Sequence, residues 1–262
     1  MHRIDSPENQ TIKLASSLKQ RKYREKFGLM VVEGQRSVQE VMARPELLQK
    51  ILVDESLADQ FHVPDLPSHI ETCLLKPGLL KRISATENPP GIAALVKIPV
   101  WSWDNILKSR LLLLLDRIAD PGNMGSILRT SWAMGVDAIL LTRGCADPYS
   151  PKVVRSSMGA VLNVPVFADV SGEQLDSLAE CGFRFICTDV EKGQRYYKIR
   201  YQQPSILVLG SEADGVSEEI KSRCNDCINI PLQSGVDSLN VAAACAIIVA
   251  EAWRQQIESM AE

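Results

Sequence analysis

The stretch LLLLLDRIADPGNMGSILRTSWAMG, residues 111–135, joins a run of leucines to a glycine-containing turn and then to a helical pattern. A continuous leucine run is typical of a strand buried on both faces, as in a parallel sheet. Gly122 and Gly125 permit a tight turn between this strand and the helix after it. The stretch therefore predicts one strand–helix unit of a parallel α/β sheet.

Strands and helices alternate through the rest of the C-terminal part. Apolar segments predict further strands at residues 136–142, 164–168, 183–189, 205–211 and 227–232. Helices are expected at residues 125–134, 152–158, 173–182, 218–223 and 239–258. Ser171 and Ser217 are the expected N-caps of two of them. This alternation implies a mostly parallel sheet with helices on both faces, and such sheets bind ligands at the carboxyl ends of their strands.

The N-terminal part shows a smaller pattern of the same kind. Short strands are predicted at residues 27–34, 49–54 and 70–75, with helical patterns at residues 34–44 and 76–84. The composition changes over residues 86–105, where three prolines precede two tryptophans. We predict a small α/β domain at residues 1–100 and a larger one at residues 101–262.

Composition excludes several classes of protein. Of the 262 residues, 45% are hydrophobic and 23% are charged, as in ordinary globular domains. The longest strongly apolar stretch has about a dozen residues, too short for a membrane span, which needs about 20. The N-terminus has no apolar signal region, so no secretion is expected. Seven cysteines without framework spacing indicate reduced thiols, and we expect a cytoplasmic protein.

The sequence gives little support for a metal site or for catalysis by histidine. Cys224 and Cys227 form one CxxC pair, but a zinc site would need two more ligands nearby, so no metal is expected. The three histidines, His2, His62 and His69, all lie in the N-terminal part. Chemistry housed in residues 101–262 must therefore proceed without an imidazole from its own domain, which excludes Ser-His-Asp triads, Cys-His dyads and His-ligated metals there.

The net charge of −3 is unevenly distributed, with +2 in residues 1–100 and −5 in residues 101–262. Six cations and one acid, Glu25, lie between residues 13 and 26. This basic stretch is either the solvated face of a helix or a phosphate-binding patch. Its candidate binding residues are Lys13, Lys19, Arg21, Lys22 and Arg24.

Polar residues follow three of the predicted strands. The first strand end carries Asn123, Gly125 and Arg129 in the spacing N-x-G-x3-R. Because this turn is not G-x-G-x-x-G, a dinucleotide site is not expected. The second, GSEADGVSEE at residues 210–219, places Glu212 and Asp214 between glycines, which suits a cationic or hydroxyl-bearing ligand.

The third strand end leads through a loop, residues 231–238, into the long apolar helix. Ser238 is a natural N-cap for that helix, and Asn240 lies at its start, where a core helix would not need an amide. The alanine-rich residues 242–246 allow close packing, either in a crowded core or on a helix–helix dimer face.

Taken in order, these motifs resemble a known family. N-x-G-x3-R, LVLGSEADGVS (residues 207–217) and INIPLQSGVDSLNVAAA (residues 228–244) closely resemble the three signature motifs of the SpoU-type (TrmH-like) RNA ribose 2'-O-methyltransferases of the SPOUT superfamily. KVVRSSMGAVLNVPV, residues 152–166, resembles the family's intermediate segment, so the resemblance covers roughly residues 110–255. Residues 22–42 and 84–96 look like the L30e-type substrate-binding domain often attached to these enzymes.

The resemblance implies an α/β fold whose C-terminal segment forms a deep trefoil knot, a rare exception among folds. It also implies S-adenosylmethionine as cofactor and a homodimer with the active site near its interface. Matched position by position, the cofactor-binding residues would be Leu209, Gly210, Glu212, Ile230, Pro231, Leu239 and Asn240. The catalytic set would be Arg129, Asn123, Glu212, Ser238 and Asn240. Asp214 departs from many relatives, which have Gly or a basic residue after the glutamate, and this extra acid can alter RNA contact.

For the reaction, we expect a ribose 2'-hydroxyl to attack the methyl carbon of a sulfonium. Arg129 would hold an RNA phosphate and the developing charge rather than act as a base, because a guanidinium stays protonated in proteins. The proton would leave through a phosphate oxygen or water. Asn123 would orient the Arg129 loop, and Glu212, Ser238 and Asn240 would hold the ribose and the knot loops.

The expected substrate is RNA, and the basic stretch becomes the expected RNA-binding surface. Ribosomal RNA is favoured because the extra N-terminal domain resembles those of ribosomal RNA modifiers, some of which confer antibiotic resistance. Transfer RNA is the nearest alternative. A non-catalytic RNA-binding or ribosome-assembly factor is a further alternative, and a Rossmann dehydrogenase is a distant one.

Overall fold

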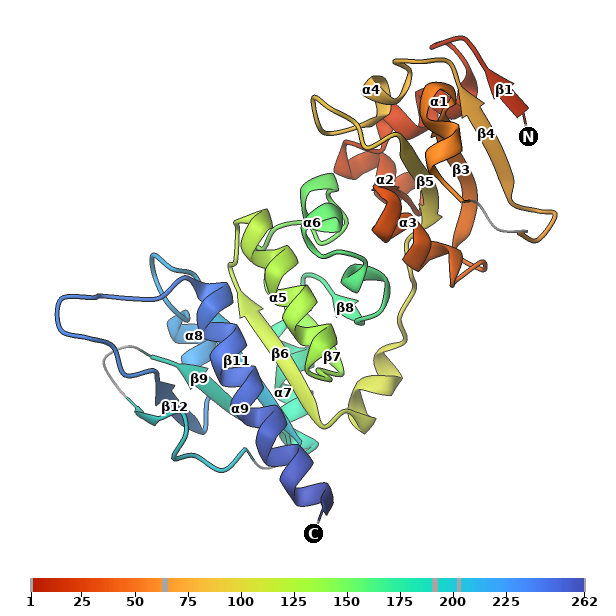
Figure 1. Cartoon of the computed structure of the whole chain (residues 1–262). Coiled ribbons are helices and arrows are strands. Elements are labelled where there is room, and N and C mark those ends of the chain that lie inside the picture. Colours follow the sequence, from red (N-terminus) through yellow and green to blue (C-terminus); the bar gives the residue numbers. More distant parts are fainter. Residues whose placement is uncertain (1, 63–65, 190–192, 202–203, 262) are drawn as a thin grey trace. The chain divides into compact units, whose positions relative to one another are not determined.

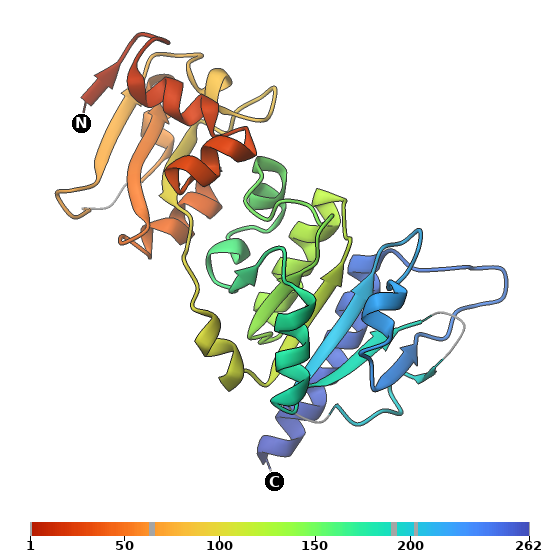
Figure 2. The ribbon, with the colours of Figure 1, turned by 180° about the vertical axis from the view of Figure 1, so that it is seen from behind.

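The computed structural model describes residues 2–62, 66–189, 193–201 and 204–261, shown from two sides in Figures 1 and 2. The chain forms two compact units. The smaller unit contains Met1–Val100 and Asp147–Leu162, and the larger contains Trp101–Ala146 and Asn163–Glu262. None of the helices in the described ranges has the length and apolarity needed to span a bilayer.

The larger unit is built on a seven-stranded sheet in the order β10-β12-β9-β11-β6-β7-β8, and every neighbouring pair in it is parallel. The strands are β6 Leu111–Asp116, β7 Ala138–Leu141, β8 Val166–Phe167, β9 Arg184–Thr188, β10 Gln194–Arg195, β11 Ser205–Gly210 and β12 Asp226–Asn229. The predicted parallel α/β sheet is confirmed. Only β10 had no counterpart in the sequence pattern, because two residues are too few for an alternation.

Helices cover both faces of this sheet. On one face α5 (Pro121–Ala133) and α9 (Val241–Ala261) pack side by side. On the other face α7 (Gly172–Glu180) and α8 (Glu218–Lys221) bury Leu175, Leu178 and Ile220 against the strands. The leucines of β6 are fully buried, as expected for a strand covered on both sides.

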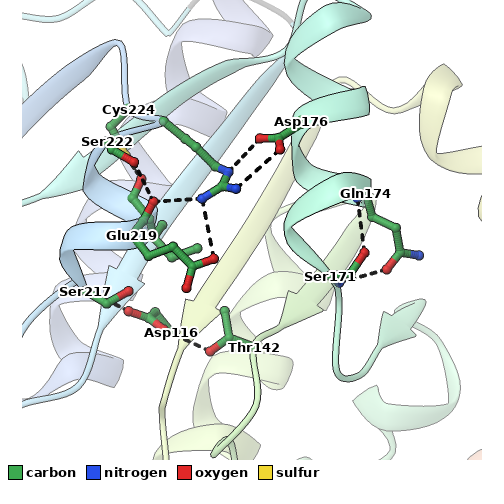
Figure 3. Close-up of polar contacts among 11 residues, drawn as sticks. Asp116, Thr142, Ser171, Gln174, Asp176, Ser217, Glu219, Ser222 and Cys224 are labelled. Carbon is green, nitrogen blue, oxygen red and sulfur yellow. Dashed lines mark hydrogen bonds and ion pairs between the residues drawn. The ribbon is translucent and has the colours of Figure 1, made fainter.

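Two polar contacts fix α7 and α8 in place (Figure 3). Ser171 and Gln174 form a capping box, because each side chain accepts a hydrogen bond from the other residue's backbone N–H. The guanidinium of Arg223, just after α8, donates to Asp176 of α7 over 2.7 Å. The segment that follows α8 is therefore anchored to a packed helix. The predicted N-cap at Ser171 is confirmed.

The smaller unit has a mixed five-stranded sheet in the order β1-β4-β3-β5-β2. Its strands are β1 His2–Ile4, β2 Leu29–Glu33, β3 Leu48–Asp54, β4 Glu71–Leu75 and β5 Ile92–Lys97. Its helices are α1 Gln10–Ser17, α2 Arg21–Phe27, α3 Gln35–Met42 and α4 Leu80–Ile83. The basic stretch thus lies on α1, α2 and the turn between them, where Ile12 and Ala15 of α1 and Leu18 just after it are buried in the core.

Residues 147–162 belong to the smaller unit, although the residues before and after them in sequence belong to the larger one. Their helix α6 (Pro151–Ser156) packs on β2. Arg24 is only 4% exposed, and its guanidinium donates to the carbonyl oxygens of Leu18 and Lys19 and pairs with Asp147. The prediction that Arg24 binds RNA is therefore wrong. Counting cations in a sequence window does not reveal a carboxylate that folding brings from 123 residues away.

We predict that Arg24→Met destabilises the smaller unit by about 3 kcal/mol, because it leaves the largely buried Asp147 without its partner. The double variant with Asp147→Asn should recover part of that loss, since both charges are then absent. Urea unfolding of the wild type, both single variants and the double variant measures the coupling. Strictly additive losses would show that the pair is not coupled.

Candidate functional site

A cavity of about 500 Å³ opens at the carboxyl ends of β9, β11 and β12 in the larger unit. Five of the residues expected to bind a cofactor line it: Leu209, Gly210, Glu212, Ile230 and Leu239. Ser238 lines the cavity as well. Among the described residues, Pro231 and Asn240 are not part of the cavity lining. Residues of the second and third motifs, which are separate in sequence, thus line one cavity.

The turn after β11 can form only because residue 210 is a glycine. Residues 211–215 close on themselves through hydrogen bonds from Gly215 N to Ser211 O, at 2.9 Å, and from Asp214 N to Ser211 Oγ, at 3.1 Å. A Cβ added to Gly210 would lie 2.0 Å from the carbonyl carbon of Gly215, deep inside van der Waals contact. Gly210 therefore holds one wall of the cavity by letting the backbone fold over it.

The carboxylate of Glu212 connects all three motifs. Its Oε1 accepts hydrogen bonds from Asn240 Nδ2 at 2.7 Å, from Asn123 Nδ2 at 3.1 Å and from Val241 N at 3.1 Å. Asn240 Nδ2 also donates to Asn123 Oδ1 at 2.9 Å. These three side chains come from residues 28 to 117 positions apart. The structure brings them together as one polar cluster, which we call the motif junction.

The start of α9 is capped by Asn240 and not by Ser238. The side-chain Oδ1 of Asn240 accepts from Ala242 N at 3.0 Å and lies 3.4 Å from Ala243 N, and the helix begins at Val241. The expectation of an N-cap at Ser238 is wrong, because the helix begins two residues later than that role requires. Asn240 therefore serves both the helix and the motif junction.

A second carboxylate, which the sequence analysis did not select, secures the same edge of the sheet. Asp116, at the end of β6, is only 2% exposed. It accepts from Thr142 Oγ1 at 2.9 Å and from Ser217 N at 2.7 Å (Figure 3). These bonds link the ends of β6 and β7 to the segment that follows the Gly210 turn. Its position directly after the leucine run is the sequence feature that could have identified it.

Arg129 lies on α5, six residues beyond Asn123, which corresponds to about 9 Å along the helix axis. Its side chain is exposed, and within the described part of the chain its guanidinium makes no hydrogen bond or ion pair. The structure does not bring Arg129 into the motif junction. Its five donors remain available to an external anion.

The cavity also has lining residues that the sequence analysis missed. Thr188 ends β9 and Asp189 follows it, and Ile228 and Asn229 belong to β12. Asp189 Oδ2 lies 3.3 Å from Lys221 Nζ, so this carboxylate is paired at the cavity wall. The rule that ligands bind at the carboxyl ends of parallel strands applies to β9 as well, and it would have identified Thr188 and Asp189.

Two cysteines, Cys187 and Cys227, contact each other near this wall. Cys227 Sγ lies 2.8 Å from Cys187 Sγ, and desolvation is the main cause that raises the pKa of Cys227 to about 11. A thiol with that pKa carries little thiolate near neutral pH, and thiolate is the metal-binding form. Among the described residues, no group of three or more His, Cys, Asp or Glu side chains is arranged to hold a metal ion.

Apart from Arg24, the expected RNA-binding residues lie on the surface of the smaller unit. Lys13, Lys19, Arg21 and Lys22 are all exposed. Lys13 pairs with Glu8 at 2.6 Å and Arg21 pairs with Glu25 at 2.7 Å, whereas Lys22 Nζ lies 4.8 Å from the ring centroid of Tyr23. Exposed pairs of this kind are weak and can exchange for phosphate contacts.

We predict that Gly210→Ala destabilises the larger unit by about 3 kcal/mol, because the added methyl group overlaps the backbone of Gly215. Ala213→Ser is the matched control, since it changes an exposed side chain in the same turn. Thermal and urea unfolding of both variants test the prediction. An unchanged unfolding midpoint for Gly210→Ala would contradict the close approach.

Models of known families match both parts of the chain. Residues 110–250, more than half of the chain, match the SpoU rRNA Methylase family. Residues 9–94 match the MRM3-like substrate binding domain. The first match contains the whole motif junction and the cavity, and the second contains the basic stretch.

Similar proteins are known by sequence and by structure. The chain is 32% identical to 23S rRNA (guanosine(2553)-2'-O)-methyltransferase RlmP of Bacillus subtilis, over 95% of this chain and 98% of that protein. It is 33% identical to the 23S rRNA (uridine(2479)-2'-O)-methyltransferase of Streptomyces viridochromogenes, over 71% and 68% respectively. The crystal structure of the SpoU methyltransferase AviRb from Streptomyces viridochromogenes, in complex with AdoMet, superimposes with a TM-score of 0.81 at 26% identity, over 95% of this chain and 99% of that one. The chain therefore belongs to the SpoU rRNA methylase family.

Proposed function

We propose that this protein transfers a methyl group from S-adenosylmethionine to a ribose 2'-hydroxyl of ribosomal RNA. The motif junction carries the proposal, because Glu212, Asn123 and Asn240 meet beside a cavity of about 500 Å³. Two relatives that are named for this reaction on 23S rRNA are 32% and 33% identical to the chain.

The cavity fits S-adenosylmethionine in size and chemistry. Its volume lies within the usual range of small-molecule sites, about 300–1,000 Å³. Apolar side chains such as Leu209 and Ile230 suit the adenine ring, and the carboxylates of Asp189 and Asp237 suit the ribose hydroxyls and cationic groups. When bound, the cofactor supplies a methyl group activated on a sulfonium.

The protein's own contribution is mainly positioning. A displacement at the methyl carbon needs the ribose oxygen, the carbon and the sulfur in line, and holding reactants in such a geometry can supply much of the rate enhancement. Asn123 and Asn240 are held in fixed orientations by Glu212, and Ser238 lines the cavity beside them. They form the platform against which the target ribose is placed.

Arg129 holds an RNA phosphate and stabilises the charge that develops at the attacking oxygen. A guanidinium can bind phosphate through two parallel hydrogen bonds. Glu212 Oε1 already accepts three hydrogen bonds, so we assign this residue to positioning rather than to proton transfer. The proton of the hydroxyl leaves to a phosphate oxygen or to water.

We also propose a role for each domain, a knotted chain and a dimer, on the basis of the family and of the two units. Residues 1–100 serve as an RNA-binding domain, and residues 101–262 serve as the methyltransferase domain, with residues 147–162 packed on the former. We propose a trefoil knot around the start of α9, where Asn240 contacts residues of two earlier motifs. A homodimer through the larger unit and a cytoplasmic location complete the proposal.

Mass-spectrometric mapping of 2'-O-methyl groups tests the reaction. Deproteinised ribosomal RNA, ribosomal subunits and transfer RNA are each incubated with the protein and labelled S-adenosylmethionine. We expect one new methyl group on ribosomal RNA, and a turnover at least 100-fold lower for Arg129→Ala and Arg129→Lys at saturating cofactor. Methylation of transfer RNA alone would overturn the choice of substrate. Absence of both cofactor binding and methylation would support a non-catalytic factor, and retained turnover in both variants would remove Arg129 from the mechanism.

Neutralising the basic stretch is expected to weaken RNA binding without affecting the cofactor. Replacing Lys19, Arg21 and Lys22 by Gln removes three exposed cations, two on α2 and one just before it. The slope of log affinity against log salt should fall by about 2, since each phosphate contact on single-stranded RNA contributes about 0.7. Fluorescence anisotropy at several salt concentrations measures the slope, and calorimetry with S-adenosylmethionine is the control. An unchanged slope would exclude this surface.

A further inference from the structure

The segment GQRYYKIRY, residues 193–201, combines cations and aromatic rings at one edge of the larger sheet. It contains Arg195, Lys198 and Arg200 and no acid, and all three cations are exposed. Within the described part of the chain, none of the three forms an ion pair. We call residues 193–201 the basic edge segment. Its charge contrasts with the net −5 of residues 101–262.

The basic edge segment is held in a defined conformation. Its β10 residues pair with β12, and Gly193 approaches so closely that a Cβ there would lie 2.6 Å from Cys227 O. Tyr201 is buried, its hydroxyl donates to Tyr196 O at 2.8 Å, and the side chain of Gln255 on α9 bonds its backbone at 3.0 Å. The exposed side chains therefore project from a fixed backbone, which lowers the entropy cost of binding.

Tyr197 supplies an exposed ring among these cations. It is 50% exposed and packs edge-on against Tyr196, with ring centroids 5.2 Å apart and an interplanar angle of 84°. This contact orients the ring while it leaves part of its surface to solvent. An oriented ring flanked by cations is the arrangement with which proteins stack a base and hold the adjacent phosphates.

The segment begins at the rim of the cavity. Arg195 is the register partner of Asn229 in the ladder between β10 and β12, and its guanidinium lies 3.5 Å from Asn229 Oδ1. Asn229 and the neighbouring Ile228 line the cavity. An RNA strand whose ribose enters the site would have its next nucleotides within reach of this edge.

We infer that the basic edge segment binds the RNA strand beside the target nucleotide. Tyr197 stacks on an unpaired base, and Arg195, Lys198 and Arg200 contact the backbone phosphates. This inference rests on the proposed function, since it assumes an RNA substrate beside the cofactor cavity. It adds to the larger unit a set of RNA contacts of its own.

The chemistry favours RNA over other polyanions. Membrane-binding segments need an apolar face towards the bilayer, but Ile199 and Tyr201 point into the protein and are buried. An acidic peptide would use the cations without any need for an oriented ring. Stacking and phosphate contact together are the requirements of a single-stranded nucleic acid.

The test uses the full-length protein, S-adenosylmethionine and a fluorescein-labelled single-stranded 12-nucleotide RNA of mixed sequence. Tyr197→Ala should weaken RNA binding about tenfold, whereas Tyr197→Phe, which keeps the ring, should stay within about twofold of the wild type. Replacing Arg195, Lys198 and Arg200 by Gln should lower the salt slope by about 2. Lys108→Gln is the matched control, because this exposed cation precedes β6, an inner strand that β12, β9 and β11 separate from β10.

The outcomes separate this inference from the proposed function. If the wild type binds the RNA and the Tyr197 and triple variants bind it equally well, the basic edge segment is not an RNA site, while the proposed function stands. If the wild type neither binds nor methylates any RNA, the proposed function fails first. Loss of binding to vesicles that contain phosphatidylserine, with unchanged RNA binding, would overturn the inference in favour of a lipid surface. Calorimetry should show unchanged cofactor affinity in every variant.

Discussion

The geometry of the site depends on one oxygen, Glu212 Oε1, which accepts hydrogen bonds from Asn123, Asn240 and Val241. A carboxylate can accept several hydrogen bonds at once, so it suits a point where three chain segments meet. Without this oxygen, the three donors would have to find water as their partner, and no shared acceptor would hold the three segments together. The Gly210 turn places Glu212 in this junction, and Asn240, a second member of the junction, caps α9.

Two further carboxylates, one in each unit, hold chain segments together. Asp116 joins the ends of β6 and β7 to the segment before α8, and Asp147 pairs with Arg24 inside the smaller unit. Charged groups are rarely buried unless they are paired or hydrogen-bonded, because desolvation is costly. Their presence here indicates that these contacts specify which segments meet, in addition to the apolar packing of the sheets.

The chemistry agrees with the limited set of ionisable groups in the larger unit. With no histidine beyond His69 and with the pKa of the Cys227 thiol raised by burial, the larger unit has few groups for proton transfer. A methyl transfer that relies on alignment and on a permanently charged arginine makes small demands on such groups. The exposed guanidinium of Arg129 and the polar platform of the motif junction are suited to that strategy.

The sequence by itself determined the parallel α/β architecture, the three strand-end motifs and the family, because these features are local: leucine runs, glycine turns and short spacings. The resemblance of these motifs to the family also pointed to five residues that line the cavity. Only the tertiary structure showed that Arg24 is buried by a carboxylate 123 residues away, that Asn240 caps α9, and that Asp116 and the basic edge segment flank the site. Such contacts depend on which distant segments become neighbours, and a one-dimensional pattern of residues does not contain that information.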